Sequence, residues 1–209
     1  ETTTGPPRII TAASLFDGHD AAINVMRRLI QSAGAEVIHL GHDQSAKAVV
    51  DCAIQEDAHG VALTSYQGGH VEYFTYIRQL LDEAGCEHIR IFGGGGGTIT
   101  PPEIKTLHES GISKIYSPDD GRTMGLMGMI HHLMGIASEV DLIHPDRIAS
   151  LDGPVTPADT AKVGLLLTMS ESADDATFKA TLDKCRSSTK EVPVIGFTGT
   201  GGAGKSSLL

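Results

Sequence analysis

The chain has 209 residues, enough for one domain and part of a second, with 40% hydrophobic and 20% charged residues. Its formal net charge of -10 argues against a general nucleic-acid binder, because neutralising phosphates requires a basic surface. No apolar run approaches the roughly 20 residues of a membrane span, so we expect neither nucleic acid nor a membrane among its partners.

Five short apolar runs alternate with helical patterns over the first two thirds of the chain. The strand candidates span 8–13, 36–40, 61–64, 88–92 and 114–117. The helix candidates span 20–32, 45–57, 71–85, a segment from 101 onward and 121–136. Alternation of this kind predicts a parallel sheet with helices on both faces.

The number of these units predicts an α/β fold of the flavodoxin type, with a five-stranded parallel sheet in the order 2-1-3-4-5. The ligand site of such a fold lies beyond the carboxyl ends of the strands. Three unusual loops fall at these ends, at 17–22, 65–70 and 93–97. Because strands 1, 3 and 4 are neighbours in this order, we expect the loops to converge on one region.

The loop after the first strand carries a candidate metal ligand. His19 follows Asp17 by two residues on a strand-to-helix connection. One ring nitrogen of His19 can bind a metal while Asp17 accepts a hydrogen bond from the other nitrogen. Such a carboxylate partner fixes the tautomer of the ring and makes the imidazole a better donor.

The loop after the fourth strand is a run of five glycines, Gly93–Gly97. Without side chains at the end of that strand, a large flat or elongated ligand can approach the backbone. Small residues on the neighbouring loops have the same effect: Ala21, Ala22, Gly68 and Gly69. The cleft therefore suits a long organic tail better than a compact metabolite.

Three structural explanations compete with a binding site. A single histidine on a loop is usually solvated or hydrogen-bonded, and a glycine run can be a flexible loop. An aspartate after the first strand also occurs in phospho-acceptor receiver domains of the same fold. The convergence of the loops favours a ligand, but composition alone leaves its identity open.

Two of the loops resemble the signature of cobalamin-binding domains. The segment 17–22, Asp-Gly-His-Asp-Ala-Ala, is similar to the family's Asp-x-His-x-x-Gly, with Ala22 in place of the glycine. The family's Ser-x-Leu element falls on 64–66, Thr-Ser-Tyr, where Tyr66 departs from leucine. The resemblance covers residues 8–136.

The resemblance implies a specific mode of cobalamin binding, with the benzimidazole tail displaced from cobalt and buried beside the first strand. His19 would then take the lower axial position on cobalt, and Asp17 would orient His19. Thr64 or Ser65 would contact the buried tail. The full set of cofactor-binding candidates is Asp17, Gly18, His19, Asp20, Thr64, Ser65, Gly93, Gly94 and Gly95, the glycines standing for the family's Gly-Gly element.

Residues 137–191 are a different kind of sequence, which we interpret as a helical linker packed on a neighbour. The segment 156–159, Thr-Pro-Ala-Asp, has the layout of a capping box and predicts the start of a helix. The segment 172–175, Ser-Ala-Asp-Asp, predicts a second start. Short helices of this length are marginal in isolation, which is why we expect a packing partner.

The last part of the chain, 192–209, predicts the beginning of a nucleotide-binding domain. An apolar run at 192–197 leads into Gly199–Ser206, which matches the phosphate loop Gly-x-x-x-x-Gly-Lys-[Ser/Thr]. Lys205 would neutralise the terminal phosphates and Ser206 would ligate Mg²⁺. The nucleotide-binding candidates are Gly202, Ala203, Gly204, Lys205, Ser206 and Ser207, which do not distinguish GTP from ATP.

The combination of a cobalamin domain (1–136), a linker and a phosphate-loop domain resembles the fused isobutyryl-CoA mutase family. The resemblance implies adenosylcobalamin as the cofactor of a radical carbon-skeleton rearrangement between isobutyryl-CoA and n-butyryl-CoA. It also implies a chaperone-type GTPase that uses GTP with Mg²⁺ to gate cofactor loading. The acyl-CoA would bind to a barrel domain outside this chain, so we assign no catalytic residue here, and we expect a homo-oligomer.

Two other classes of function remain. One is a corrinoid methyl-carrier module, but such modules usually carry a helical cap before the first strand, where this chain has little sequence. The other is a cobalamin-free regulatory domain coupled to an NTPase. Failure to bind any corrinoid would favour the regulatory class.

The termini and the cysteines bear on the state of the protein. The chain opens with Glu1 rather than Met and stops at Leu209, so we expect a fragment that is inactive on its own. Three cysteines, Cys52, Cys86 and Cys185, are far apart and in no ligand spacing, and no signal peptide is visible. We therefore expect reduced thiols in a cytoplasmic protein.

Overall fold

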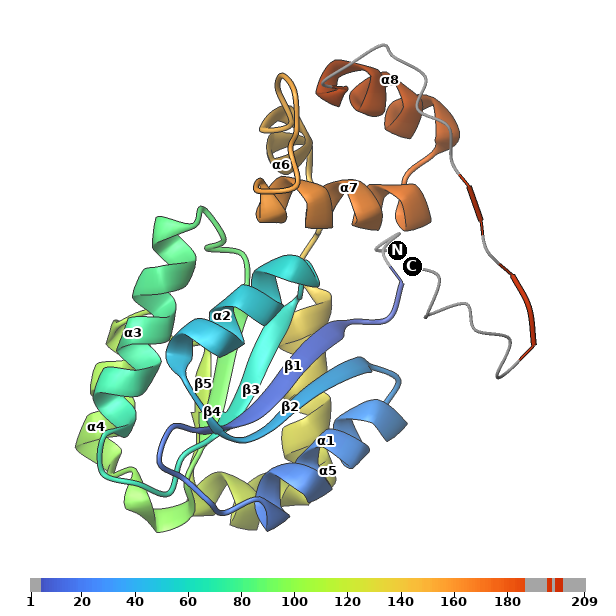
Figure 1. Ribbon diagram of the computed structural model, residues 1–209. Coiled ribbons are helices and arrows are strands. Elements are labelled where there is room, and N and C mark those ends of the chain that lie inside the picture. The colour runs from blue at the N-terminus through green and yellow to red at the C-terminus, as the bar shows by residue number, and fades with distance from the viewer. Residues whose placement is uncertain (1–4, 187–194, 197, 201–209) are drawn as a thin grey trace.

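The computed structural model describes residues 5–186, 195–196 and 198–200. Within these ranges five strands form one parallel sheet in the order β2-β1-β3-β4-β5 (Figure 1), so the predicted fold and strand order are confirmed. The strands are β1 (Arg8–Ser14), β2 (Glu36–Gln44), β3 (Gly60–Thr64), β4 (Arg90–Gly94) and β5 (Lys114–Tyr116).

Helices connect the strands and cover both faces of the sheet, as the alternating pattern predicted (Figure 1). Ile30 and Ile130 share one buried cluster with Ile9, whereas Val49 and Phe74 belong to the cluster on the other face. Successive residues of a strand point to opposite faces, so β1 contributes to both clusters. The connecting elements are α1 (Ala21–Ser32), α2 (Ala46–Gln55), α3 (His70–Glu83), η1 (Gly96–Thr98), α4 (Pro101–Glu109) and α5 (Pro118–Ser138).

Strand β2 is longer than the sequence predicted, because it continues past Gly41 to Gln44. Its pairing with β1 shifts register twice: Ala12 pairs with Gly41, and Ser14 pairs with Gln44. Gly41 (φ 91°) and Asp43 (φ 57°) take left-handed backbone conformations in this stretch. Such bulges bend a strand and change the direction in which its side chains point.

Helix α5 begins at Pro118 rather than at Gly121 as predicted. The reason is a capping box, in which the Ser117 hydroxyl accepts a hydrogen bond from the Asp120 N–H (3.2 Å) and the Asp120 carboxylate accepts one from the Ser117 N–H (2.8 Å). Gly125 then interrupts the helix with φ 69° and ψ 171°. The element therefore consists of two helical segments joined at a kink.

The predicted linker contains three helices in its described part, α6 (Pro145–Ala149), α7 (Thr160–Ser172) and α8 (Asp175–Cys185). They form a small core of their own and lie at the amino ends of the sheet strands, opposite the three loops (Figure 1). The core consists of Leu151, Leu165, Met169 and Cys185.

The predicted start of the first linker helix is wrong by several residues, because α7 begins at Thr160 instead of directly after Thr156. The Asp159 carboxylate accepts hydrogen bonds from the Thr156 N–H (2.8 Å) and hydroxyl (2.7 Å). These bonds close a turn before the helix, and Asp159 becomes the N-cap residue. The second predicted start agrees with the structure, since Asp174 caps α8 through its side chain.

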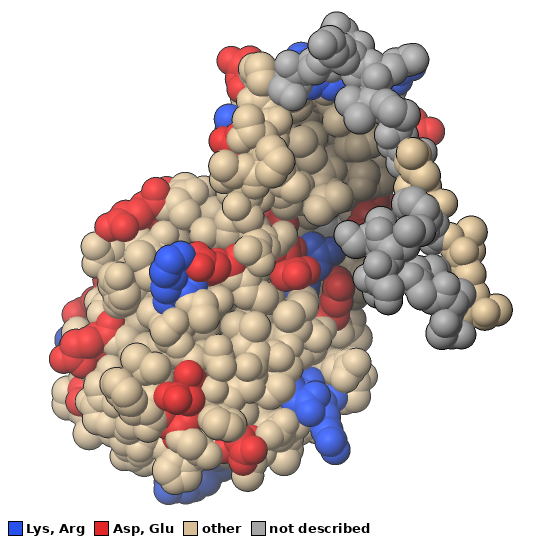
Figure 2. All heavy atoms as spheres, viewed as in Figure 1, with Lys and Arg blue, Asp and Glu red and all other residues tan. Residues whose placement is uncertain are grey.

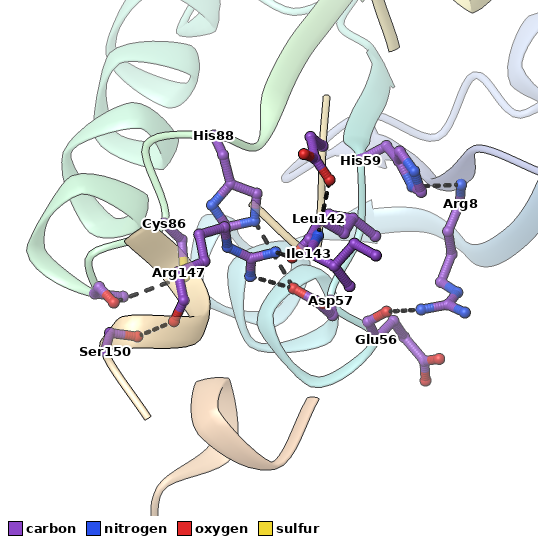
Figure 3. Close-up of polar contacts among 12 residues, drawn as sticks. Arg8, Glu56, Asp57, His59, Cys86, His88, Leu142, Ile143, Arg147 and Ser150 are labelled. Carbon is purple, nitrogen blue, oxygen red and sulfur yellow. Dashed lines mark hydrogen bonds and ion pairs between the residues drawn. The ribbon is translucent and has the colours of Figure 1, made fainter. Parts of the chain in front are cut away.

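The linker helices are docked on the sheet domain through buried polar contacts (Figure 3). Arg147 of α6 places Nη2 2.6 Å from Oδ1 of Asp57, which follows α2. His88 places Nε2 3.8 Å from the same oxygen. A Cβ at Gly164 would lie 3.0 Å from the Ile54 carbonyl oxygen, so α7 crosses the end of α2 at close range.

The surface and the cysteines of the described residues have three plain features. The face drawn in Figure 2 carries acidic and basic side chains interspersed, with no continuous basic area among the described residues. No helix in the described ranges is both long enough and apolar enough to cross a membrane. Cys52, Cys86 and Cys185 all lie in these ranges and are free thiols.

Candidate functional site

The three loops at the carboxyl ends of β1, β3 and β4 meet, as the strand order predicted. The Tyr66 N–H donates to Oδ2 of Asp17 (2.6 Å), which ties the β3 loop to the β1 loop. The Ser65 N–H donates to the Gly94 carbonyl (2.8 Å), which ties the β3 loop to the glycine run. The hydroxyls of Ser14 and Ser65 are 2.9 Å apart and buried beneath these contacts.

Asp17 and His19 form the pair that the sequence suggested. Oδ1 of Asp17 accepts a hydrogen bond from the His19 N–H (2.9 Å) and lies 2.8 Å from Nδ1 of the same residue. Because a carboxylate can only accept, Nδ1 carries the proton, and in the neutral ring the lone pair is then on Nε2. The Asp17 side chain is fully buried, whereas the His19 side chain is 75% exposed. The pair therefore presents a free imidazole nitrogen at the surface.

Hydrogen bonds keep the Asp17 carboxylate ionised despite its burial. Burial alone would raise the pKa of Asp17, but the N–H groups of Tyr66 and His19 and the His19 ring together outweigh it and lower the pKa. A carboxylate that receives several N–H groups favours its charged form. A charged Asp17 is the form that can hold the proton on Nδ1 of His19.

A cavity of about 580 Å³ opens beside this pair, between α1, α5 and the loops after β3, β4 and β5. A smaller cavity of about 60 Å³ lies directly beneath it and shares Met26, Thr64, Gly94 and Tyr116 with it. The walls are mainly apolar, and small residues of α1 form part of them: Ala21 and Ala22.

Thr64 is the notable polar group of this cavity. Its hydroxyl is buried and has no hydrogen-bond partner among the described residues, although it lines both cavities. Buried hydroxyls are nearly always paired, so an unpaired one facing a cavity points to a ligand that supplies the partner. Ser65, the alternative contact suggested by the sequence, is absent from the cavity lining and faces Ser14 instead.

The glycine candidates divide into two structural classes. A Cβ at Gly93 would overlap the Phe74 ring, and one at Gly95 would overlap the Ser65 carbonyl oxygen, so both are required by packing. A Cβ at Gly94 would meet only the Tyr116 carbonyl oxygen, at 3.5 Å. Gly94 is thus the glycine whose missing side chain leaves space in the cavity.

The remaining first-loop candidates make fewer contacts. Gly18 has open space where a Cβ would stand. Asp20 is the N-cap residue of α1 but makes no side-chain capping hydrogen bond. Both are exposed beside His19, where a ligand could reach them.

Several lining residues were not predicted from the sequence. Tyr116 lines both cavities, and its hydroxyl lies 3.0 Å from Nδ1 of His132. The Tyr66 ring lies 5.5 Å from the His19 ring, between centroids. Leu126 and Met129 contribute from α5. The sequence feature that could have identified Tyr116 is its place at the carboxyl end of the fifth strand, which lies next to the fourth strand and its glycine run in the predicted strand order.

The structure does not test the predicted nucleotide-binding site at the end of the chain. The candidates Gly202, Ala203, Gly204, Lys205, Ser206 and Ser207 lie outside the described residues. In the described ranges no group of three or more His, Cys, Asp or Glu residues could hold a metal ion.

Comparison with known proteins gives a consistent picture at the level of sequence. The family model described as "B12 binding domain" matches residues 7–115. The chain is 49% identical over 208 residues to the fused isobutyryl-CoA mutase of Geobacillus kaustophilus (strain HTA426), covering 96% of the chain and 19% of that protein. It is 34% identical over 115 residues to the 2-hydroxyisobutanoyl-CoA mutase small subunit of Aquincola tertiaricarbonis, covering 54% of the chain and 82% of that subunit.

A second fused isobutyryl-CoA mutase, from Cupriavidus metallidurans (strain ATCC 43123 / DSM 2839 / NBRC 102507 / CH34), is 52% identical over 203 residues, with 96% of the chain and 18% of that protein covered. The chain thus spans about a fifth of the length of these fused relatives. Among solved structures, a cobalamin-binding protein from Desulfitobacterium hafniense DCB-2 has a TM-score of 0.52 at 18% identity, with 62% of the chain and 58% of that chain covered. This structural similarity supports the assignment of the fold alone.

Proposed function

This chain belongs to the B12-binding domain family, and we propose that it binds cobalamin at the carboxyl ends of its strands, with His19 as the lower axial ligand of cobalt. The observation that carries the proposal is the Asp17–His19 pair, which presents a free imidazole nitrogen beside a cavity of about 580 Å³. A corrin ring brings four nitrogen ligands of its own, so one histidine suffices from the protein.

The residues of the cavity fit a displaced benzimidazole tail. The apolar walls and Gly94 leave room for a flat ring system beside β3 and β4. The unpaired Thr64 hydroxyl can then bond to a nitrogen of the tail and lose its desolvation penalty. Ala21 and Ala22 let the nucleotide part of the tail pass close to the start of α1.

The roles of the residues follow from these contacts. Asp17 holds the proton on Nδ1 of His19, so that Nε2 is the donor atom. Tyr66, Gly94 and Tyr116 shape the wall and keep water from the tail. Bound adenosylcobalamin would supply the radical chemistry of a carbon-skeleton rearrangement, and the protein supplies binding and orientation.

For the whole protein we propose an adenosylcobalamin-dependent acyl-CoA mutase that interconverts isobutyryl-CoA and n-butyryl-CoA. Identities of 49% and 52% to fused isobutyryl-CoA mutases, each over 96% of the chain, support this assignment. The acyl-CoA would bind to a barrel domain outside this chain. The intact enzyme would be a homo-oligomer.

We also propose that the segment beginning near residue 192 opens a GTPase domain that gates cofactor loading. The Gly-x-x-x-x-Gly-Lys-Ser match at 199–206 supports it, with Lys205 on the phosphates and Ser206 on Mg²⁺. The similarity to the fused mutases extends over 96% of the chain and so includes at least part of this segment. We take GTP rather than ATP as the nucleotide, as the resemblance of the sequence to the fused mutase family implies.

Equilibrium binding of adenosylcobalamin to the chain, followed by absorbance, tests the cobalamin proposal. We expect saturable binding, weakened in His19→Ala, and weaker binding of cobinamide, which lacks the nucleotide tail. A methyl-carrier module would instead favour methylcobalamin over adenosylcobalamin. Folded protein that binds no corrinoid at all would contradict the proposal and favour the regulatory class.

A further inference from the structure

The end of strand β2 has an irregular backbone beside the loop that carries His19. Between its pairings with Thr11 and Ser14 of β1, strand β2 contains two more residues than β1, because Thr11 pairs with His39 and Ser14 with Gln44. Bulges concentrate next to functional sites, where they redirect a side chain. Here they bring Asp43 to the β1 loop.

Asp43 makes two hydrogen bonds to the loop that carries His19. Its Oδ1 accepts from the Phe16 N–H (2.7 Å), and its own N–H donates to the Asp17 carbonyl (3.3 Å). The two bonds hold the N–H group of Phe16 and the carbonyl group of Asp17. They therefore restrain the backbone of these two residues, at the base of the His19 loop. Neither contact could be read from the sequence, where 43 lies beyond the predicted strand.

Both partners of the shorter bond adopt a backbone conformation that non-glycine residues rarely take. Phe16 has φ 63° and Asp43 has φ 57°. Asp tolerates this region, but a bulky residue such as Phe does so at a cost. The Phe16 side chain is 84% exposed, so packing of its ring does not explain the conformation. The hydrogen bond from Phe16 to Asp43 is therefore one of the restraints on it.

The conformation at Phe16 sets the position of the Asp17 carboxylate. Phe16 lies inside a turn closed by the bond from the Asp17 N–H to the Ser14 carbonyl (3.0 Å). From this turn the carboxylate reaches both His19 and Tyr66. A rotation at Phe16 would move the carboxylate and break at least one of these contacts.

We propose that Asp43 is a positioning residue for cobalamin binding: it fixes the Phe16–Asp17 backbone so that Asp17 can hold His19 in the orientation that ligates cobalt. This role rests on the proposed function of His19. The carboxylate of Asp43 contacts the loop backbone and acts on the cofactor only through Asp17 and His19.

Two substitutions separate the hydrogen bond from the backbone requirement. Asp43→Gly removes the acceptor but accepts a left-handed φ without strain. Asp43→Asn keeps both an acceptor oxygen and tolerance of that φ. The neighbouring His42→Ala leaves the Asp43 contacts in place and serves as the matched control. Urea denaturation of each variant shows whether the fold is intact.

The first measurement needs no cofactor. Amide hydrogen exchange of Phe16, Asp17 and His19 in the free protein should quicken in Asp43→Gly by about three- to tenfold, the worth of one hydrogen bond. Asp43→Asn and His42→Ala should exchange like wild type. Unchanged exchange in Asp43→Gly would show that Asp43 does not restrain the loop, and would overturn the proposal.

The second measurement is the affinity for adenosylcobalamin. We expect Asp43→Gly to bind about three- to tenfold more weakly than wild type, with binding restored in Asp43→Asn. Wild type and Asp43→Gly binding equally well would overturn the positioning role while leaving the proposed function intact. Wild type that binds no cobalamin would instead overturn the proposed function, and with it the role of Asp43.

Discussion

The carboxylate of Asp57 and the guanidinium of Arg147 are 90 residues apart in the chain and 2.6 Å apart in space. Asp57 is 3% exposed and has a left-handed φ of 46° at the end of α2. Burial would raise the pKa of Asp57, but His88 and Arg147 outweigh it and lower the pKa. The pair, drawn in Figure 3, therefore holds the linker helices against the sheet domain.

Arg147→Met should destabilise the protein by about 3 kcal/mol, because it removes the arginine that compensates the buried Asp57 charge. The free energy of unfolding from urea denaturation measures the loss. The double variant Asp57→Asn with Arg147→Met should recover part of it, since the uncompensated charge is then gone. Equal stability of wild type and Arg147→Met would show that the ion pair does not secure the linker.

Because of His59, we expect the free energy of unfolding to fall in mild acid. Burial and the charge of Arg8 lower the pKa of His59 from 6.5 to about 4, and its Nδ1 accepts a hydrogen bond from the Arg8 N–H. As the pH falls from 6.5 towards 4, the unfolded chain binds a proton at His59 that the folded chain does not. The free energy of unfolding is then unaffected by this group above pH 6.5 and falls below it, by up to about 3 kcal/mol.

Urea denaturation between pH 7 and pH 4 measures this slope, on the order of one proton per molecule. His59→Asn supplies a matched control, because Asn can offer an acceptor to the Arg8 N–H but does not titrate. The variant should lack the part of the slope that belongs to His59, while acidic groups such as Asp57 keep theirs. Identical slopes would assign the pH dependence to other groups.

The strand order and the meeting of the three loops could be predicted from the sequence, because both follow from local alternation of strands and helices. The contact of Asp43 with Phe16 could not, since it depends on register shifts between β1 and β2 that no local pattern encodes. The start of α7 was misplaced for a related reason: Thr156 and Asp159 have the residue types of a capping box but form a turn before the helix.

The roles of the individual glycines in the run 93–97 could not be predicted from the sequence either. The sequence indicated that small residues were needed, but only the tertiary neighbours Phe74 and Ser65 distinguish the packing glycines from Gly94. Likewise, Thr64 and Ser65 carry the same chemical group in adjacent positions. Thr64 is the last residue of β3 and lines the cavity, whereas Ser65 begins the loop and faces Ser14, a division that the sequence left open.

Gly93→Ala and Gly94→Ala should therefore affect different properties of the protein, stability in the first case and cofactor affinity in the second. Gly93→Ala should cost about 1–3 kcal/mol of stability, because the added methyl group overlaps Phe74. Gly94→Ala should leave the urea midpoint nearly unchanged but weaken adenosylcobalamin binding by about tenfold, as expected for an overpacked ligand site. The two measurements on both variants form an internal control, and a loss of affinity without loss of stability in Gly93→Ala would contradict this division.

Thr64→Val preserves the shape of the side chain and removes only its hydroxyl. Since that hydroxyl has no partner in the described protein, the urea midpoint should stay the same or rise slightly. Binding of adenosylcobalamin should weaken by about three- to tenfold, while binding of cobinamide, which has no benzimidazole tail, should not change. Equal losses for both corrinoids would place the Thr64 hydroxyl away from the tail.

The measurement that tests the central claim most directly is electron paramagnetic resonance of the cob(II)alamin-loaded protein with histidine labelled by nitrogen-15. We expect the label to change the splitting of the cobalt signal, and His19→Ala to abolish that change, because Nε2 of His19 is the free ring nitrogen beside the cavity. Bound cob(II)alamin whose splitting ignores the label would contradict ligation by His19.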